Sequence, residues 1–383
     1  MSVDNNIPKG WVKTTLGKLI DIFNQKRIPL SAKARNTRKG IYPYYGASNI
    51  VDYIDDYIFN GEYLLISEDG ENLNTRNTPI AFIAKGKFWV NNHAHIVKGK
   101  YPHLTKYLEL YFSKLDISPF ITGAVQPKLS KGNLINIPII IPKSLKEQIA
   151  IAKILTAFDD KIENLQAQNK TLETTAQTIF KEWFGKYQIG DELPDGWRVG
   201  KLEEVVDVFD SKRIPLSKAQ REEKKGKYRY FGATSVMDYV DDFLFDGIYL
   251  LFAEDGSVID NNGNPFLQYV WGKFWVNNHT HILKGKNGFS TELLYVFCKK
   301  MRVSGIVNGA VQLKINQKNL LNFELIIPSN NILEKLDLII QPLLFKLRIN
   351  SDQIQTLKKT RDTLLPKLMS GQLRVSEFKE NTV

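Results

Sequence analysis

The sequence predicts an α+β protein built from two homologous mixed α/β domains and two long helices, and three observations carry this prediction. Segments recur at a constant offset of 186 residues. Each copy is rich in short β-type runs separated by turns. Each copy is followed by apolar residues spaced by seven, the pattern of a coiled-coil helix. The 383 residues are also too many for one small core, since a domain averages about 150 residues.

The repeat is clearest in "GKFWVNNHAHIVKGK" (86–100), which returns as "GKFWVNNHTHILKGK" (272–286) with thirteen of fifteen residues unchanged. "KRIPLS" returns unchanged, "YYGAS" returns as "YFGAT" and "GAVQPKL" as "GAVQLKI", all at the same offset. The ungapped match covers about 135 residues, far more than one unit of a solenoid, so it indicates two copies of a whole domain.

Within each copy the elements can be placed in order. In the first copy we expect strands in the runs "EYLLIS", "IAFIA", "KFWVNN" and "HIVKG", with the turn residues of "EDGENLNTRN" between them. A helix over 104–115 and a last apolar strand over 136–142 follow. Each copy is therefore expected to form a mixed α/β domain of about 140 residues.

The segment after each copy predicts a long helix. Each segment contains two interleaved rows of residues spaced by seven. In the first segment the rows are Leu155, Ile162, Asn169, Ala176 and Trp183, and Phe158, Leu165, Leu172 and Ile179. In the second segment they are Leu336, Leu343, Asn350, Leu357 and Leu364, and Ile340, Leu347, Ile354, Arg361 and Leu368. Asn169 and Asn350 interrupt these rows, where a polar residue costs stability but fixes register and partner. Pro342 is expected to kink the second helix or delay its start, and Gly371 to cap its end.

Two arrangements of the long helices are open, because each can pack on its own domain or the two can pair. We favour pairing as an antiparallel coiled coil, since the seams have matched length and no other segment could cover them. At about 1.5 Å per residue, 36 residues would form a rod of roughly 54 Å that holds the domains apart. Antiparallel pairing would relate the domains by a pseudo-two-fold axis. The expected divisions are a domain over 1–144, a helix over 145–187, a domain over 188–329, a helix over 330–372 and a tail over 373–383.

The bulk composition limits the function classes. A formal charge of +11 indicates a polyanionic partner, usually nucleic acid, although charge alone leaves ribosome-like and membrane-surface roles open. The single cysteine, Cys298, excludes an intramolecular disulfide and fits a reducing cytoplasm. We expect a cytoplasmic protein, because no apolar run approaches the roughly 18 residues of a membrane span and the start "MSVDNNIPKGW" is unlike a signal peptide.

Two similar domains alternating with two long helices, the second ending in "LLPKLMSGQLRV" (364–375), resemble the specificity subunit of type I restriction–modification systems. "KIENLQAQNKTLETTAQTIFKEWF" (161–184) is similar to the central conserved region of that family, and "LPDGWRVGKLEEVVDV" (193–208) to its re-entry into a second target-recognition domain. The resemblance implies that each domain reads one half of a split sequence in double-stranded DNA. It also implies that the paired helices set the spacing and dock methyltransferase subunits, and that restriction subunits join through the complex.

The same resemblance implies a recognition subunit without catalysis, which needs no cofactor. Two similar helices favour two methyltransferase subunits. Antiparallel pairing would match the two-fold symmetry of duplex DNA, so we expect two half-sites about one helical turn apart. Because the copies are so alike, we expect the two half-sites to be related in sequence.

Polar loops supply the expected DNA contacts, because Asn, Gln, Arg, Lys and Ser match base edges while Lys and Arg hold phosphates. The expected contacts in the first copy are Lys26, Arg27, Tyr45, Ser48, Asn49, Glu68, Asp69, Asn72, Asn74, Arg76, Asn91, Asn92, His93, Gln126 and Lys128. Those in the second copy are Lys212, Arg213, Phe231, Thr234, Ser235, Glu254, Asp255, Asn261, Asn262, Asn277, Asn278, His279, Gln312 and Lys314. Solvated turns and packed aromatic side chains are the competing interpretations. The loop over 72–78 has diverged from its counterpart over 258–264, so we expect it to distinguish the half-sites.

Catalytic and structural alternatives fit less well. A metal-dependent nuclease could use Asp195 with Glu222, Glu223 and Lys224, but the first copy has no carboxylate at the matching positions. The run Asn264-Pro265-Phe266 lacks the second proline of a methyltransferase motif, and no P-loop is present. A stand-alone DNA-binding protein stays open, as does a coiled-coil protein that binds no DNA, although the latter leaves the basic repeated domains unexplained.

The paired histidines of the repeat have several interpretations. His93 and His95, like His279 and His281, are expected to alternate along one strand and to project from one face. With only His103 in addition, two imidazoles make a weak metal site, so we predict no metal. Burial as hydrogen-bonded side chains, or orientation of the preceding asparagine pairs toward DNA, are the two interpretations left.

Overall fold

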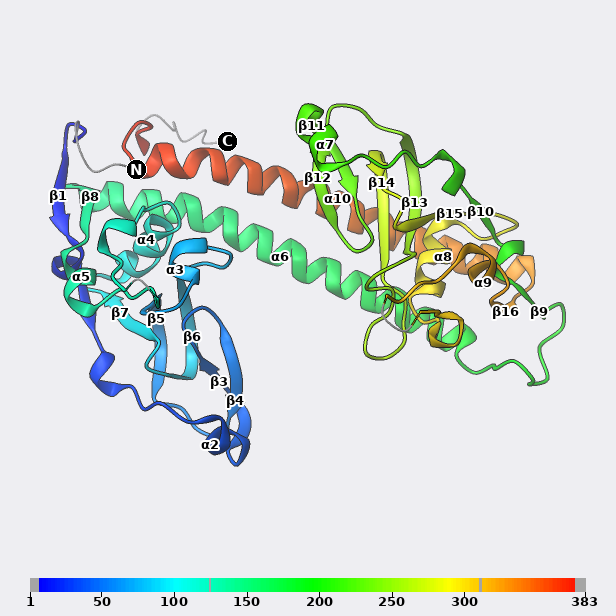
Figure 1. The fold of residues 1–383 in the computed structure, drawn as a ribbon, viewed down its shortest axis with the longest axis horizontal. Helices are drawn as coiled ribbons and strands as arrows, with labels where there is room; N and C mark the ends of the chain where they lie inside the picture. The colour runs from blue at the N-terminus through cyan, green and yellow to red at the C-terminus, as the bar shows by residue number, and fades with distance from the viewer. Residues whose placement is uncertain (1–6, 124, 310–311, 376–383) are drawn as a thin grey trace. The chain divides into compact units, whose positions relative to one another are not determined.

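The computed structural model describes residues 7–123, 125–309 and 312–375, so most of the expected tail and part of each "GAVQ" motif lie outside the described residues. The chain forms two compact units (Figure 1). Unit 1 comprises residues 1–163 and 355–383, and unit 2 comprises residues 164–354. Each unit contains one repeat together with part of both long helices, and therefore differs from the sequential division that the repeat pattern suggests.

Unit 1 contains a mixed sheet, a small ribbon and short helices. Its strands are β1 (Trp11–Thr15), β2 (Ile20–Ile22), β3 (Lys39–Tyr45), β4 (Ile50–Ile54), β5 (Phe59–Ser67), β6 (Ala81–Val90), β7 (Ala94–Gly99) and β8 (Pro138–Pro142). Its helices and 3-10 turns are α1 (Leu16–Leu19), η1 (Asn24–Lys26), α2 (Ala32–Asn36), α3 (Asn72–Thr75), α4 (Pro102–Phe112), η2 (Ser118–Phe120) and α5 (Lys131–Asn136). Within the described ranges the sheet order is β2-β7-β5-β6-β3-β4, beside a β1-β8 ribbon. Only β3 and β6 pair in parallel there.

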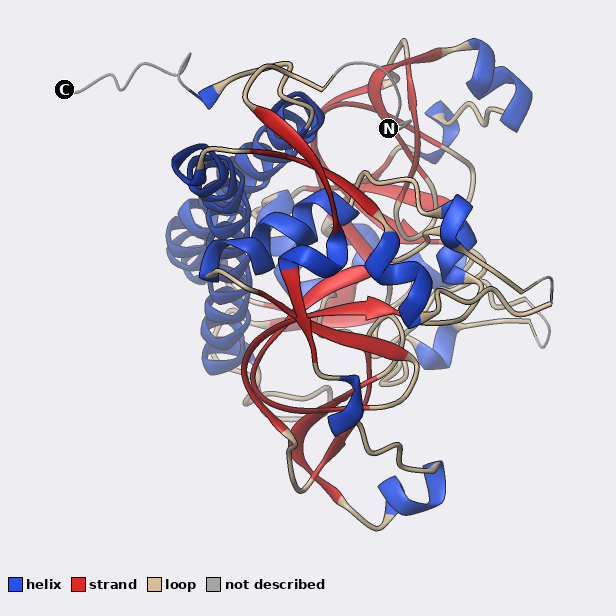
Figure 2. Cartoon of the chain, turned by 90° about the vertical axis from the view of Figure 1, so that its left-hand side faces the viewer, coloured by secondary structure: helices blue, strands red, loops and turns tan. Residues whose placement is uncertain are grey.

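Unit 2 repeats this architecture strand by strand. Its strands are β9 (Arg198–Lys201), β10 (Val206–Val208), β11 (Lys225–Phe231), β12 (Val236–Val240), β13 (Phe245–Ala253), β14 (Leu267–Val276), β15 (Thr280–Gly285) and β16 (Glu324–Ile327). Its short helices and 3-10 turns are η3 (Leu202–Glu204), η4 (Asp210–Lys212), α7 (Lys218–Glu223), α8 (Thr291–Cys298), η5 (Ser304–Ile306) and α9 (Gln317–Leu321). The sheet order β10-β15-β13-β14-β11-β12 equals that of unit 1, so the predicted duplication of a mixed α/β domain is confirmed. Figure 2 shows the strands together with the short helices, of which α4 packs against β5, β6 and β7, and α8 against β13, β14 and β15.

Side chains of the central strand β5 alternate between two apolar clusters. Leu64 and Ile66 join the larger cluster, which includes the buried face of α4. Leu65 points the other way and joins the smaller cluster with Phe59 and Phe88. This is the period of two expected for a strand that is covered on both faces. The strand is therefore held rigidly, and the loop that follows Ser67 starts from a fixed point.

Strand β6 joins two runs that the sequence suggests are separate strands. "IAFIA" and "KFWVNN" lie in one strand, with Gly86 (φ +75°) paired to Gly61 of β5 (φ +127°). Glycine adopts these positive φ angles without steric cost, so the hairpin bends there without leaving the sheet. Gly247 and Gly272 form the same pair in unit 2. The prediction of two strands is therefore wrong.

The long helices α6 (Leu145–Phe184) and α10 (Asn330–Met369) each contain 40 residues. In unit 1 the first part of α6 meets the last part of α10, where Arg361 Nη1 donates to Asp159 Oδ1 at 2.7 Å. In unit 2 the last part of α6 meets the first part of α10, where Asn169 Nδ2 donates to Ser351 Oγ at 3.0 Å. Each unit on its own therefore shows antiparallel pairing, which confirms the predicted pairing of the helices.

The helices also pack on the domains, so the two arrangements left open by the sequence are combined. Leu155 of α6 and Leu368 of α10 are buried in the core of unit 1. Ala176 of α6 and Ile340 of α10 are buried in the core of unit 2. The heptad positions thus face both the partner helix and the neighbouring sheet domain. Among the described residues, no helix combines the length and the apolar character that a membrane span requires.

Pro342 does not delay the second helix, because α10 already begins at Asn330. A proline removes the N–H that would bond the carbonyl four residues earlier, here that of Leu338. Leu338 is 77% exposed, so water can solvate its carbonyl group and the helix continues. Gly371 behaves as predicted: its φ is +71°, and Leu373 N donates to Lys367 O at 3.0 Å beyond the helix end.

Candidate nucleic-acid interface

Both repeats contain a largely shielded arginine that ties three loops together. Arg27 follows η1, and its Nη1 donates to Glu68 Oε2 at 2.6 Å. The same atom donates to the carbonyl oxygens of Asn92 at 3.1 Å and Ala94 at 2.9 Å. Glu68 lies directly after β5, and Asn92 lies two residues before the start of β7. Arg27 therefore fixes the loops at one end of the central strands.

Unit 2 contains the same tie. Arg213 Nη1 donates to Glu254 Oε2 at 2.6 Å, and to the carbonyl oxygens of Asn278 at 3.3 Å and Thr280 at 2.8 Å. The side chains of Arg27 and Arg213 are only 16% and 17% exposed. Retention of this arginine in both repeats is thus explained by loop anchoring, and phosphate binding is not needed to explain it.

The loop that carries Gln126 and Lys128 joins the same cluster. Leu129 N donates to Glu68 O at 2.7 Å, and Asp69 forms an isolated bridge with Lys128. In unit 2, Ile315 N donates to Glu254 O at 2.8 Å, and Asp255 bridges to Lys314 in the same way. The structure therefore brings together, in each unit, four of the loops that the sequence analysis selected separately. We call these groups the loop clusters: residues 26–27, 67–70, 91–93 and 126–128 in unit 1, and 212–213, 253–256, 277–279 and 312–314 in unit 2.

The two histidines of each repeat do not share a face, so that prediction is wrong. His93 lies in the turn before β7, is exposed, and holds Nδ1 at 2.8 Å from Asp69 Oδ1. His95 lies inside β7 and is fully buried. The turn displaces His93 from the strand, so the alternation of strand side chains does not apply to it. His279 and His281 differ in the same way, with His279 Nδ1 at 2.6 Å from Asp255 Oδ1.

The buried histidines are hydrogen-bonded at both ring nitrogens. Asn24 Nδ2 lies 2.8 Å from His95 Nδ1, and His95 Nε2 lies 2.7 Å from Leu129 O. An amide nitrogen can only donate and a carbonyl can only accept, so Nδ1 accepts and Nε2 carries the proton. Burial lowers the pKa of His95, and the Leu129 carbonyl and Glu68 oppose this shift. His95 is thus a neutral side chain that links β7 to the loop over 126–128.

His281 has a different neighbour, and the resulting group has metal-ligand chemistry whose members are engaged in ion pairs. One ligand atom each from Asp210, Glu254 and His281 lie within 4.8 Å of one another. Asp210 Oδ2 is only 2.6 Å from His281 Nδ1, and Glu254 Oε2 is 2.6 Å from Arg213 Nη1. The guanidinium group already supplies the positive charge that a metal ion would bring. These residues therefore form a hydrogen-bonded ion-pair network.

The glycine turn after β3 presents small polar side chains beside the loop cluster. Gly46 N donates to Asn49 O at 2.8 Å, and Ser67 Oγ donates to Ala47 O at 2.7 Å. Tyr45 packs against Phe82 and Phe88, and burial raises its pKa. Packing of the aromatic residue, one of the two interpretations of this turn, therefore describes Tyr45 in the structure.

The equivalent turn of unit 2 exposes Thr234 and Ser235 but buries its aromatic residue. Gly232 N donates to Ser235 O at 2.8 Å, as in unit 1. Phe231 is 4% exposed and packs edge-on against Phe274. Asn277 is 5% exposed, and its Oδ1 accepts from His279 N at 2.9 Å. Phe231 and Asn277 can therefore shape the surface but cannot touch a ligand in this conformation.

The divergent loops differ in backbone structure as well as in sequence. In unit 1 the loop forms α3, in which Asn72 is held by Thr78 N at 2.9 Å and by Ser48 Oγ at 3.2 Å. Arg76 ends this helix with φ +50° and donates to Leu115 O. Asn74 is left exposed on α3.

In unit 2 the loop closes around Asp260 instead. Asp260 Oδ1 accepts from Asn262 N at 2.8 Å and from Asn264 N at 2.9 Å. These bonds lower the pKa of Asp260, and the bond from the Asn264 backbone has the largest effect. Asn261 and Asn262 are exposed at the tip of the loop. The two repeats thus carry different polar side chains on the same scaffold.

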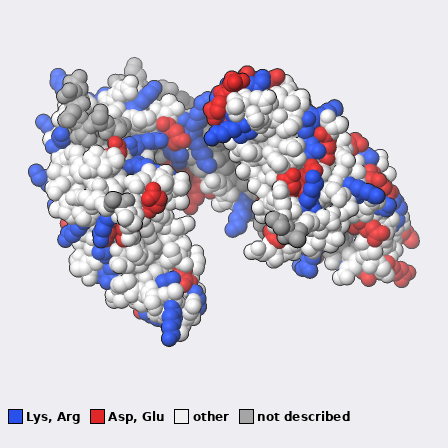
Figure 3. Space-filling view, viewed as in Figure 1, with Lys and Arg blue, Asp and Glu red and all other residues white. Residues whose placement is uncertain are grey.

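The surface charge does not mark the interface by itself. On the face drawn in Figure 3, most of the surface is uncharged, and Lys and Arg side chains are dispersed over both units. Within the loop clusters the exposed cations are Lys26 and Lys128, repeated as Lys212 and Lys314. Lys128 Nζ stays 3.7 Å from Glu68 Oε1, while Lys314 Nζ lies 3.3 Å from Glu254 Oε1.

Sequence reasoning missed two features. Asn24 and Asp210 orient the buried histidines, and their equal position two residues before each "KR" pair was the available signal. The second feature is an exposed apolar row on α10, formed by Leu338, Pro342, Phe345 and Ile349. Its spacing of four, three and four residues was visible in the sequence as a second seam.

Comparison with known protein families gives one match for each of the two repeats. The family model described as type I restriction modification DNA specificity domain matches twice, over residues 8–174 and 194–359. The type I restriction enzyme MjaIX specificity subunit of Methanocaldococcus jannaschii is 29% identical, over 97% of this chain and 95% of its own length. A type I restriction enzyme specificity subunit from Haemophilus influenzae is 41% identical over 143 residues, covering 37% of this chain and 36% of its own.

A solved structure has the same fold. The S subunit of a type I restriction–modification system from M. genitalium matches with a TM-score of 0.63 at 18% identity, covering 96% of this chain and 98% of that chain. At this identity the likeness concerns the fold alone.

Proposed function

Because this chain belongs to the family of type I restriction modification DNA specificity domains, we propose that it is the DNA-recognition subunit of a type I restriction–modification complex. Specificity subunits recognise the target and leave catalysis to other subunits. The observation that carries the proposal is the occurrence of one loop cluster per unit, built on an identical strand order in both. In this function each domain reads one half of a bipartite sequence in double-stranded DNA.

The exposed polar residues of the loop clusters and of the loops beside them form the DNA-facing surface in this proposal. In unit 1 they are Lys26, Asn49, Asn74, Asn92, His93, Gln126 and Lys128, and in unit 2 they are Lys212, Thr234, Ser235, Asn261, Asn262, Asn278, His279, Gln312 and Lys314. The lysines match phosphates, whereas the amide and hydroxyl side chains match base edges. This surface supports both the affinity and the sequence preference that a recognition subunit needs.

The partly or fully buried members of the predicted set support this surface from behind. Arg27 and Glu68 are engaged with each other, and Arg213 and Glu254 repeat that contact. Phe231, with Asn277 beside it, is buried. The others of this kind are Tyr45, Ser48, Asp69, Asn72, Arg76, Asn91 and Asp255, which are partly buried in their own units. They position the exposed residues and do not contact DNA directly in this proposal.

The divergent loops account for the difference between the half-sites. Asn74 on α3 has no equivalent side chain in unit 2, where Asn261 and Asn262 occupy the tip of a loop closed by Asp260. The loop clusters beneath them are the same. The half-sites are therefore expected to share bases read by the common residues and to differ at the bases read by these loops.

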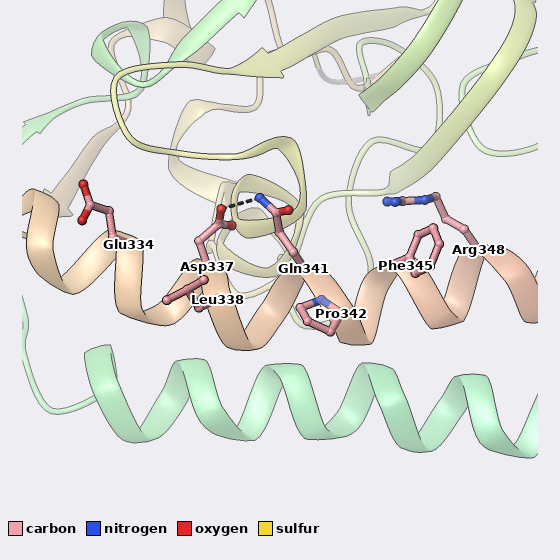
Figure 4. Close-up of a pocket in the computed structure, with 7 residues that line it drawn as sticks. All are labelled: Glu334, Asp337, Leu338, Gln341, Pro342, Phe345 and Arg348. Atoms are coloured by element: carbon pink, nitrogen blue, oxygen red, sulfur yellow. Dashed lines mark hydrogen bonds between the residues drawn. The ribbon is translucent and has the colours of Figure 1, made fainter.

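The exposed apolar row on α10 is the docking surface that we assign to a methyltransferase subunit. Figure 4 shows Leu338, Pro342 and Phe345 on α10, with Arg348 beside Phe345. The guanidinium carbon of Arg348 lies 5.4 Å from the Phe345 ring centroid. Leu338 and Phe345 are 77% and 55% exposed. Apolar side chains that are exposed next to one another, as in this row, can mark a protein-interaction surface.

The spacing of this row indicates the chemistry of that partner. Residues 338, 342, 345 and 349 follow the four-three-four pattern by which one helix packs along another. The expected partner therefore presents an apolar helix. Two methyltransferase subunits would join the complex, and restriction subunits would join through them.

The test is co-expression of the chain with its methyltransferase subunit, followed by base-resolution mapping of methylation. A bipartite motif that appears only when both proteins are present is the expected result. Methylation that is unchanged by the chain would contradict the proposal. Binding of random duplex DNA without any sequence preference would instead favour a stand-alone DNA-binding protein.

A further inference from the structure

Helices α6 and α10 meet at one polar layer inside unit 2. Asn169 Nδ2 donates to Ser351 Oγ at 3.0 Å and to Leu347 O at 3.4 Å. Asn350, which is fully buried, donates from Nδ2 to Gln168 Oε1 at 3.3 Å. We call Gln168, Asn169, Asn350 and Ser351 the asparagine layer.

The asparagine layer costs stability. The Oδ1 atoms of Asn169 and Asn350 are buried and accept no hydrogen bond from the described residues. The next heptad layer is apolar, with Leu165 at 2% and Ile354 at 8% exposure. A buried amide with an unpaired acceptor is less stable than a leucine in the same position, because the desolvation of its oxygen is not offset. A contribution other than stability therefore has to explain the layer.

The hydrogen bonds of the asparagine layer form in the observed register of the helices. In the observed pairing Asn169 faces Ser351. A slip of seven residues would place it opposite Leu344 or Lys358 instead. Leu344 is fully buried, so the carboxamide group would lose its partners in an apolar environment. Leucines in place of the asparagines would remove this penalty, because all neighbouring layers would then be alike.

The register matters because each sheet domain is joined closely to the start of one helix. Strand β8 ends at Pro142 and α6 begins at Leu145, while β16 ends at Ile327 and α10 begins at Asn330. The connection from α6 to β9 is longer, since it covers residues 185–197. A slip would therefore displace the helix that starts from one domain against the helix that starts from the other.

We propose that the asparagine layer fixes the register of α6 against α10 and thereby the spacer length between the two half-sites of the target. This inference rests on the proposed function. One heptad corresponds to about 10 Å of helix, and one base pair to about 3.4 Å of duplex. A slip by one heptad would therefore change the preferred spacer by about three base pairs.

The register can be measured in the full chain without DNA. The variant Asn169→Leu/Asn350→Leu is combined with cysteine pairs in which Leu165→Cys reports on three positions of α10. A cross-link between Leu165→Cys and Ile354→Cys indicates the observed register. A cross-link from Leu165→Cys to Leu347→Cys or to Arg361→Cys indicates a slip of seven residues in one direction or the other. The parent chain is expected to cross-link only through the first pair. The leucine variant is expected to melt several degrees higher and to cross-link through a slipped pair as well.

A matched control separates the layer from added apolar surface. Lys170→Leu/Gln353→Leu places the same two leucines on exposed positions beside the layer. This control is expected to keep the single cross-link of the parent. If the variant with leucines in the layer also cross-links only through positions 165 and 354, the layer does not fix the register and the inference is overturned.

The consequence for DNA is tested with the methyltransferase complex and a library of duplexes that differ in spacer length. The parent is expected to methylate one spacer length, and the leucine variant also spacers about three base pairs shorter or longer. If cross-linking shows a slipped register in the leucine variant but the variant still methylates only one spacer length, the link between register and DNA is overturned. Absence of methylation by the parent at every spacer would contradict the proposed function, while the cross-linking result would still decide the claim about register.

Discussion

Arg27 donates to Glu68 across 2.6 Å, and both side chains are largely shielded from solvent, at 16% and 14% exposure. The same guanidinium group holds the backbone before β7, so one residue connects the end of β5 to the start of β7. The equivalent pair in unit 2, Arg213 with Glu254, has the same 2.6 Å separation. The loop clusters are thus anchored from inside.

Substitution Arg27→Gln is expected to destabilise unit 1 by about 2 kcal/mol, because it leaves the Glu68 carboxylate without its cation in a shielded site. Urea unfolding of the full chain measures this loss as a lower midpoint. The matched control is Lys26→Gln, which changes an exposed neighbour and is expected to alter stability by less than about 0.5 kcal/mol. Equal effects of the two substitutions would contradict the anchoring role.

The exposed lysines of the loop clusters are expected to set the salt dependence of DNA binding. Replacing Lys26, Lys128, Lys212 and Lys314 with Gln should lower the slope of log affinity against log salt by about 0.9 for each phosphate that the variant no longer neutralises. Fluorescence anisotropy across a salt series measures the slope. Lys170→Gln/Lys346→Gln, which removes exposed charges from the long helices, serves as the control. An unchanged slope in the cluster variant would show that the phosphates are bound elsewhere.

The loop residue Asn74 is expected to act on one half-site only. Asn74→Ala should weaken binding to the intact target by about 1–3 kcal/mol, the value of one bidentate base contact, and should relax the preference at one position. Competition among duplexes mutated in either half separates the two halves. Asn136→Ala on α5 is the control, because it is also an exposed asparagine. Loss of preference in both halves would argue against one domain per half-site.

The pKa of His95 makes unit 1 sensitive to acid. Burial lowers this pKa from its usual 6.5, so the folded state binds the proton less well than the unfolded state. The stability that the neutral ring provides is fully present above about pH 6.5. It is lost as the pH falls from there through the folded pKa.

Urea unfolding at pH 7.5 and at pH 5.5 tests this dependence. His95→Gln is expected to lower stability at pH 7.5 and to reduce the difference between the two pH values. His93→Gln changes the exposed histidine of the same pair and serves as the control for His95→Gln. If the pH dependence followed His93 instead, the buried histidine would not be its source.

The apolar row on α10 is expected to bind the methyltransferase subunit. Phe345→Ser should reduce co-purification of that subunit at least tenfold, which corresponds to about 1.4 kcal/mol, while the chain remains folded. Ile41→Ser alters an exposed apolar residue of β3, 79% exposed, and should leave co-purification unchanged. Loss of the complex in both variants, or in neither, would place the docking surface elsewhere.

Duplication and the long helices could be predicted from the sequence because both leave periodic signals. The offset of 186 residues fixed the correspondence between the repeats, and the heptad rows located α6 and α10. The continuity of β6 could not be predicted, because a glycine between two apolar runs indicates a turn. In the structure Gly86 continues the strand with a φ of +75°.

The site could be predicted only in part, because exposure depends on tertiary partners. The sequence marks Lys26 and Arg27 as equivalent neighbouring cations, whereas the structure exposes the first and engages the second with Glu68. His93 and His95 likewise differ because a turn ends just before β7. Pro342 is expected to disturb the helix, but the carbonyl group that would have bonded its N–H belongs to Leu338, which lies on the exposed face.

The most direct test of the central claim is an exchange of the divergent loops followed by base-resolution methylation mapping. Residues 71–80 are replaced by the sequence of residues 257–266, which has the same length. One half of the methylated motif is expected to change toward the other half, while the second half and the spacer stay as they were. A motif that is unchanged, or that changes in both halves, would contradict recognition of one half-site by each domain.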